Sequence, residues 1–145
     1  MILTADEFFS TILDCGFASV TAARDRRVFC PSLDWVREFG SWLVAHAKPY
    51  QAEKYDCDDF AEWGKVCATE ALFQNISITD AGHSFFIADV VIGSGCHLNG
   101  IPGPGVHATN ACLGNDSILY LCEPQTGQVM RSADVRGVVL LNAWL

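Results

Sequence analysis

A cysteine lies at a predicted helix entrance, in the stretch Tyr55-Asp56-Cys57-Asp58-Asp59-Phe60-Ala61. Asp56 is a favourable N-cap residue, so we expect the helix to begin at Cys57 and to run to about Phe73. In the first helical turn, unpaired backbone N–H groups and the positive end of the helix dipole favour a thiolate over a thiol. Cys57 therefore meets one requirement of a cysteine nucleophile. The alternative is a small, buried apolar side chain, as in most free cysteines.

A cysteine nucleophile needs a base, and the base needs a partner that orients it. The chain has four histidines, at His46, His83, His97 and His107. His46 ends a predicted helix and His97 lies in a glycine-rich loop, whereas His83 and His107 open predicted strands after the Cys57 helix. Asn110 could orient an imidazole, but strand alternation turns it to the face opposite that of His107. The choice of base is therefore between His83 and His107.

Strand pairing favours His107. Residues 114–116, Gly-Asn-Asp, can close a three-residue hairpin in which Leu113 pairs with Ser117, and this register sets His107 opposite Glu123. Directly opposed residues have Cβ atoms about 4.5–5.5 Å apart on one face, so Glu123 could accept the Nδ1 proton and fix the tautomer. A slip of one residue would remove this arrangement.

The composition places limits on the class of protein. The 145 residues fit one compact domain, 1–145, and half of them are apolar. A net charge of −8 and a pI near 4.7 argue against nucleic acid, and no apolar run is long enough to cross a membrane. Acidic residues interrupt the N-terminal apolar residues, and the seven cysteines form no CxxC pair. We expect a cytoplasmic location, or release without a signal peptide.

The first part of the chain, about 1–75, is predicted to be helical. Thr4-Ala5-Asp6-Glu7 has the form of a capping box and opens a helix that ends at Cys15-Gly16. A brief extended piece, Val28-Phe29-Cys30-Pro31, follows. Ser32 then caps a second helix through about Ala47, and the Cys57 helix is the third.

The second part, about 82–145, is predicted to be a sheet. Its short β-branched and apolar runs are separated by Gly, Pro, Asn and Asp: His83–Ile92, Val106–Leu113, Ser117–Cys122, Gln128–Ser132 and Val135–Asn142. A glycine- and proline-rich loop, 93–105, joins the first two runs. Helices first and an antiparallel sheet second predict the α+β class, with the central helix packed on the sheet.

The order helix-start Cys, strand His, strand acid resembles the papain-like cysteine peptidases in the broad sense, which include NlpC/P60 and transglutaminase-like folds. The stretch from Tyr55 to Phe60 is similar to the NlpC/P60 helix-start motif, although two aspartates replace its usual Ser-Gly pair. The combination YDCDDFA, HATNA and EPQTGQ resembles more closely the C-terminal peptidase domain of the Marasmius-type fungal agglutinins. The resemblance spans roughly Gln51 to Gln128, without the β-trefoil lectin portion, so it carries no sugar-binding expectation.

The resemblance implies a papain-like fold and a Cys-His-Glu triad. Cys57 would be the nucleophile, His107 the base and acid, and Glu123 the orienting group. Gln51 lies six residues before Cys57, the separation typical of papain-like enzymes, and would help to form the oxyanion hole; a solvated loop side chain is the alternative. In an NlpC/P60-type peptidoglycan hydrolase, His83 would replace His107.

Calcium is the cation that the acidic helix start would suit. Acids in a first turn complement the helix dipole, but they also disfavour a thiolate unless something neutralises them. Hard oxygen ligands suit calcium, and the agglutinin-type peptidases are calcium-dependent, so Asp58 and Asp59 are the predicted ligands. The chemistry itself requires no cofactor.

Two functions follow from these patterns. The first is a cysteine peptidase that cleaves a peptide or isopeptide bond of a peptide or protein substrate through a thioester, or passes the acyl group to an amine. The second is a non-catalytic papain-like module that binds a partner with its acidic surface. The reactivity of Cys57 towards iodoacetamide, compared with that of the other cysteines, distinguishes them.

Overall fold

The strands form two sheets in the computed structural model, which describes residues 1–21, 26–49, 51, 56–73, 81–94, 96 and 104–145. The smaller sheet has the order β1-β3-β4, with β1 (Ile2–Thr4), β3 (Arg27–Phe29) and β4 (Ala81–His83). The larger has the order β2-β9-β5-β6-β7-β8, with β2 (Ser19–Thr21), β9 (Val138–Trp144), β5 (Phe85–Ile92), β6 (Gly105–Leu113), β7 (Leu119–Glu123) and β8 (Gln128–Arg131). A short 3₁₀ helix, η1 (Ser132–Asp134), follows β8.

Three α-helices cover the larger sheet: α1 (Ala5–Asp14), α2 (Leu33–His46) and α3 (Cys57–Phe73). Their ends follow the capping signals. Thr4 and Glu7 form the capping box of α1, Ser32 accepts a hydrogen bond from the Trp35 backbone N–H, and the Phe60 N–H donates to the Asp56 carbonyl at the start of α3. The predicted bounds of the three helices are confirmed to within one residue.

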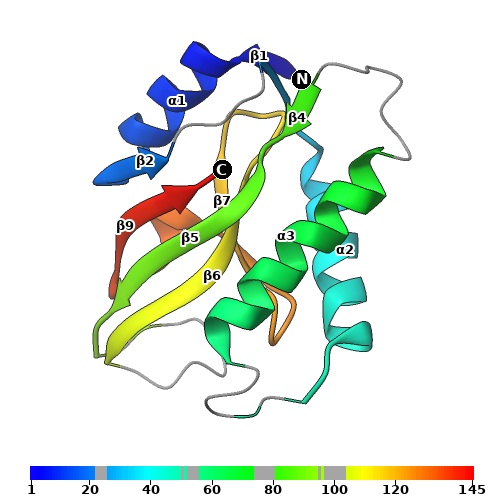
Figure 1. Cartoon of the computed structure of the whole chain (residues 1–145). Coiled ribbons are helices and arrows are strands. Elements are labelled where there is room, and N and C mark those ends of the chain that lie inside the picture. Colours follow the sequence, from blue (N-terminus) through cyan, green and yellow to red (C-terminus); the bar gives the residue numbers. More distant parts are fainter. Residues whose placement is uncertain (22–25, 50, 52–55, 74–80, 95, 97–103) are drawn as a thin grey trace.

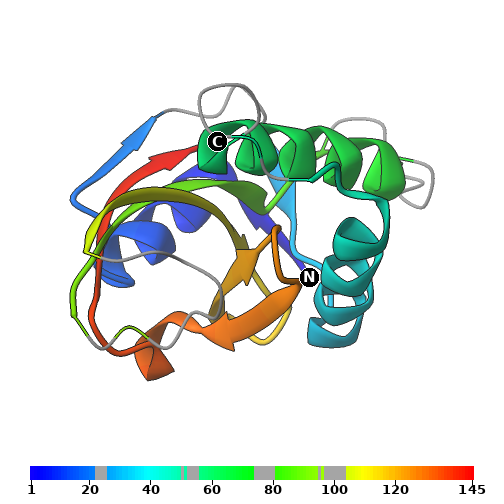
Figure 2. The ribbon, with the colours of Figure 1, turned by 90° about the horizontal axis from the view of Figure 1, so that it is seen from below.

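The larger sheet separates two apolar clusters. Phe8 and Ile12 of α1 pack with Phe86 on one face, whereas Val36 and Leu43 of α2 lie in the cluster of the other face, together with residues of α3. Alternation along the strands produces this division, because neighbouring side chains point to opposite faces. Figure 1 shows α2 and α3 side by side on one flank of the sheet and α1 at the other, and Figure 2 shows how strongly the sheet curves.

The predicted fold class, papain-like α+β with helices first and an antiparallel sheet second, is wrong in its arrangement. Strands provide most of the elements and alternate with helices from the N-terminus, since β1, β2 and β3 lie in the part predicted to be helical. The sheets are also mixed, because β2 pairs parallel to β9, and β3 parallel to β4. Three-residue strands are too short to show a period of two, so the sequence pattern does not reveal β1 and β2, whereas β3 overlaps the brief extended piece predicted at Val28–Pro31.

Some expectations concern residues outside the described ranges. Most of the predicted loop at 93–105, with His97, is among them, as is most of the connection before the Cys57 helix. Within the described residues, no helix combines the length and the hydropathy that crossing a membrane requires.

Candidate functional site

The structure brings two of the predicted site residues together. His107 Nε2 lies 2.8 Å from Glu123 Oε2, so the imidazole donates to the carboxylate. His107 is 6% exposed and Glu123 is 1% exposed. Because burial removes water as a competing partner, the pair fixes the ring orientation. It is Nε2, and not the predicted Nδ1, that meets the carboxylate, which leaves Nδ1 for another partner.

The predicted register of this hairpin is wrong by two residues. Leu113 pairs with Leu119 instead of Ser117, so the turn holds residues 114–118. Asp116 sets this longer turn, since its carboxylate accepts from the Ile118 N–H at 3.1 Å and from the Tyr120 hydroxyl at 2.6 Å. A shift of two residues keeps every side chain on the same face of the sheet. His107 of β6 therefore meets Glu123 of β7 as a diagonal neighbour and not as a directly opposed residue.

The shifted register also places two further donors at Glu123. The Thr109 hydroxyl donates to Oε2 at 3.1 Å, and the Gln125 N–H donates to Oε1 at 3.1 Å. Thr109 lies two residues from His107, so strand alternation alone could have identified it. Asn110 does turn to the other face, where its Nδ2 donates to the Ala61 carbonyl of α3 at 2.8 Å.

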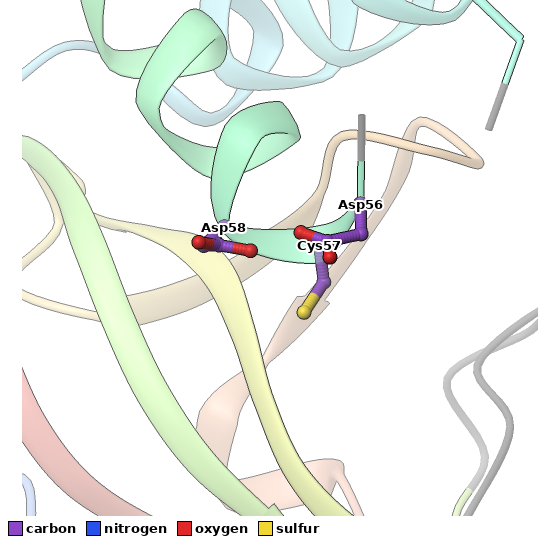
Figure 3. A group of neighbouring side chains, drawn as sticks. All are labelled: Asp56, Cys57 and Asp58. Carbon is purple, nitrogen blue, oxygen red and sulfur yellow. The ribbon is translucent and has the colours of Figure 1, made fainter. Parts of the chain in front are cut away.

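Cys57 opens α3 as predicted and is half-buried. Figure 3 shows its sulfur pointing away from the helix, between the side chains of Asp56 and Asp58. The α3 helix packs along β6, with the Ala61–Asn110 hydrogen bond between them. Among the described residues, no hydrogen bond joins the Cys57 thiol to His107. The triad geometry implied by the resemblance is thus present only for its His–Glu half.

The acids at the start of α3 serve the helix itself. Asp59 Oδ2 accepts from the Asp56 N–H at 3.3 Å. The Asp56 side chain, together with the backbone N–H groups of Asp58 and Asp59, holds the pKa of Asp58 below its ordinary value. Candidate ligand atoms of Asp56, Cys57 and Asp58 lie within 4.8 Å of one another. Asp59 thus caps the helix, while Asp58 faces Asp56.

These residues fit calcium poorly. Calcium takes about six to eight oxygen ligands, and the group offers two carboxylates and a sulfur, which is a soft donor. A bound calcium would have to take most of its ligands from water. The calcium prediction nevertheless stays a prediction.

His83, the alternative base, is engaged elsewhere. Its Nε2 lies 2.7 Å from the Thr69 hydroxyl, and its Nδ1 accepts from the Phe85 N–H at 3.3 Å. Thr69 lies twelve residues after Cys57 on α3, about 18 Å along the helix axis at 1.5 Å per residue. The structure therefore does not bring His83 to the Cys57 end of the helix.

Gln51, the predicted oxyanion donor, is exposed and forms an isolated β-bridge. No hydrogen bond links its side chain to Cys57 or His107 within the described residues. The solvated alternative fits this position, and the oxyanion role stays a prediction.

A groove lies between α2 and α3, with a volume of about 440 Å³. Trp35, Phe39 and Trp42 form one wall, in a stack whose neighbouring ring centroids are 4.9 Å and 6.0 Å apart and whose rings are almost parallel. Glu38 and Glu70 stand at its edges. The sequence analysis did not single out this groove, although the spacing of its residues on α2 places them on one helix face.

Solved structures resemble this chain, whereas no protein-family model and no curated protein matches it. One, described as the PSL1a–E64 complex, aligns with a TM-score of 0.73 and 20% identity over 99% of this chain and 50% of its own. Another is a Polyporus squamosus lectin bound to the epitope Neu5Acα2-6Galβ1-4GlcNAc, with a TM-score of 0.70 and 21% identity over 97% of this chain and 49% of its own. The chain spans about half the length of each.

The comparisons correct the family resemblance stated from the sequence. The shared fold belongs to a protein described as a lectin, and neither structure is described as a peptidase. The predicted papain-like family is therefore wrong, and so are the predicted assignments as cysteine peptidase, thiol protease and hydrolase. The motifs were short, and ordinary helix capping at Cys57 and strand pairing at His107 account for the same residues.

Proposed function

We propose that this chain is a non-catalytic binding module with a carbohydrate ligand. The observation that carries the proposal is the shared fold: nearly the whole chain superposes on part of a lectin that is bound to a trisaccharide. This proposal replaces the peptide partner expected from the sequence and keeps the alternative of a binding module.

The groove between α2 and α3 has the chemistry that a sugar requires. A pyranose ring presents C–H groups that pack on aromatic rings, and hydroxyl groups that need acceptors. Trp35 and Trp42 offer the aromatic surface, and the carboxylates of Glu38 and Glu70 offer the acceptors. The volume of about 440 Å³ suits one or two sugar rings. We therefore place the carbohydrate site in this groove.

Replacing Trp42 tests this site. Trp42→Ala removes a ring that is 43% exposed at the groove, and we expect it to weaken glycan binding by about tenfold or more. The measurement is a calorimetric titration with Neu5Acα2-6Galβ1-4GlcNAc and with Galβ1-4GlcNAc, supported by a screen on a printed glycan array.

Trp144→Ala is the matched control, since Trp144 is 45% exposed but lies on β9. Binding should survive this change. Loss of binding in both variants would point to a general effect of removing a tryptophan. If neither saccharide binds the parent chain and the array shows no other glycan, the carbohydrate proposal fails.

Thiol labelling tests the non-catalytic part of the proposal. Cys57 and Cys96 are both half-buried, so a binding module predicts similar alkylation rates with iodoacetamide at neutral pH. Burial, with Glu70 nearby, raises the pKa of the Cys67 thiol, which should react more slowly. E64, a thiol-reactive epoxide, should leave no adduct on the intact protein. A fast adduct confined to Cys57 and lost in His107→Ala would overturn the proposal.

Calcium binding has a separate test. If the acidic helix start holds calcium, a calorimetric titration gives a dissociation constant near the weak end for protein sites, about 0.1–1 mM. Asp58→Asn should abolish the heat, whereas Asp59→Asn should lower helix stability and leave the heat intact, because Asp59 is the cap. If the parent chain gives no heat with calcium, the calcium prediction is wrong.

A further inference from the structure

A smaller pocket lies on the other side of α2, between this helix and β8, with a volume of about 260 Å³. Arg37 reaches it from α2, and Arg131 reaches it from the end of β8. Among the described residues, no carboxylate forms an ion pair with either guanidinium. Both arginines are exposed, and Asp134 is the acidic residue of the pocket lining.

A buried tyrosine holds Arg131 in place. Tyr120 is 2% exposed, lines the pocket and is the direct cross-strand partner of Arg131. Its hydroxyl donates to Asp116 Oδ2 at 2.6 Å, and its oxygen accepts from the Arg131 guanidinium. Burial and the Asp116 carboxylate raise the pKa of Tyr120, and the Arg131 guanidinium opposes that rise. The guanidinium therefore lies beside the hydroxyl.

The charges of the lining limit the ligand. Arg37 and Arg131 contribute two positive charges to the lining and Asp134 contributes one negative charge, while the Asp116 carboxylate lies behind Tyr120. Arginine binds carboxylates through two parallel hydrogen bonds. A singly charged carboxylate brings less negative charge towards Asp134 and Asp116 than a doubly charged phosphate would. Asp134 can accept hydrogen bonds from hydroxyl groups of the same ligand.

We propose that this pocket is a second binding site, which takes a small hydroxylated carboxylic acid such as a sugar acid. Arg37 and Arg131 hold its carboxylate, and Asp134 accepts from its hydroxyl groups. The site is separate from the groove between α2 and α3, and it does not depend on the carbohydrate proposal for that groove.

The test is a titration of the whole chain with glucuronate, followed by NMR chemical-shift changes, with glucose as the uncharged counterpart. We expect glucuronate to bind, glucose not to bind, and rising salt to weaken the binding. Arg37→Gln and Arg131→Gln should each weaken it by about tenfold or more. Both side chains are exposed, so the variants should fold; Arg136→Gln, another exposed arginine, is the control.

Three outcomes would overturn the site: no glucuronate binding at millimolar concentration, equal binding of glucose, or binding that Arg37→Gln and Arg131→Gln leave unchanged. Tighter binding of inorganic phosphate than of glucuronate would overturn the assignment to a carboxylate. Loss of glycan binding in Trp42→Ala with glucuronate binding intact would show that the two sites are independent, as proposed.

Discussion

Gly64→Ala is expected to destabilise the protein, although alanine is the better helix former. A Cβ at this position of α3 would collide with the Asn110 side-chain oxygen. Asn110 is fully buried, and its amide donates to the Ala61 carbonyl at 2.8 Å and to the Phe86 carbonyl at 3.4 Å, so it cannot move without losing these bonds. The helix gains about 1 kcal/mol, but overpacking costs about 1–3 kcal/mol and lost buried hydrogen bonds a similar amount.

The net loss, about 1–5 kcal/mol, is measured by urea unfolding. The decisive comparison uses Asn110→Ala as the background, where the colliding group is absent. There Gly64→Ala should be neutral or stabilising by up to about 1 kcal/mol, so the sign of the effect reverses. Gly105→Ala, where an added Cβ meets nothing within 4 Å, is the control for a simple glycine replacement. A loss that persists in the Asn110→Ala background would contradict the collision.

The helices could be predicted because their start signals are local. Thr4 with Glu7, Ser32 and Asp59 each lie within three residues of the backbone groups that they cap. A pattern that specifies its structure over one turn needs no knowledge of the rest of the chain. The three helix ranges therefore follow from sequence alone.

The sheet could be predicted only in part, because pairing is non-local. Short β-branched and apolar runs locate β5 to β9, but nothing in Ser19–Thr21 indicates that it pairs with β9, more than a hundred residues away. The β6–β7 register depends on the side chain of Asp116, which extends the turn, and on Ser117, which adopts a positive φ of 61°. A three-residue loop was the simpler expectation for Gly-Asn-Asp, and it was wrong.

The candidate site shows the same division. Alternation kept His107 and Glu123 on one face despite the wrong register, so their contact could be predicted. The function could not, because a capped helix start and a paired strand histidine are compatible with chemistry and with binding alike. The two pockets beside α2 escaped prediction, since each needs an element from a distant part of the chain to complete it.

Glu123→Ala is expected to be the most costly single change at the candidate site. The carboxylate accepts three hydrogen bonds, from His107, Thr109 and the Gln125 backbone, and it is 1% exposed. Its removal leaves the buried His107 imidazole and the half-buried Gln125 N–H without this acceptor, whereas Thr109 keeps the Cys122 carbonyl, and it opens a cavity between β6 and β7. Breaking a buried pair in this way costs about 3–5 kcal/mol, which thermal and urea unfolding measure directly.

Two further variants separate the effect of losing the acceptor at Glu123 from the effect of losing its negative charge. Glu123→Gln keeps the volume and one acceptor oxygen, so we expect a smaller cost, about 1–2 kcal/mol. Adding His107→Leu to Glu123→Ala removes the stranded donor, so the double variant should be less unstable than the sum of the single changes. Glu62→Ala, at an exposed site on α3, should stay within about 0.5 kcal/mol of the parent. If Glu123→Ala also stayed within that range, the carboxylate would be solvated in solution, and the buried His–Glu pair could not be what fixes the imidazole.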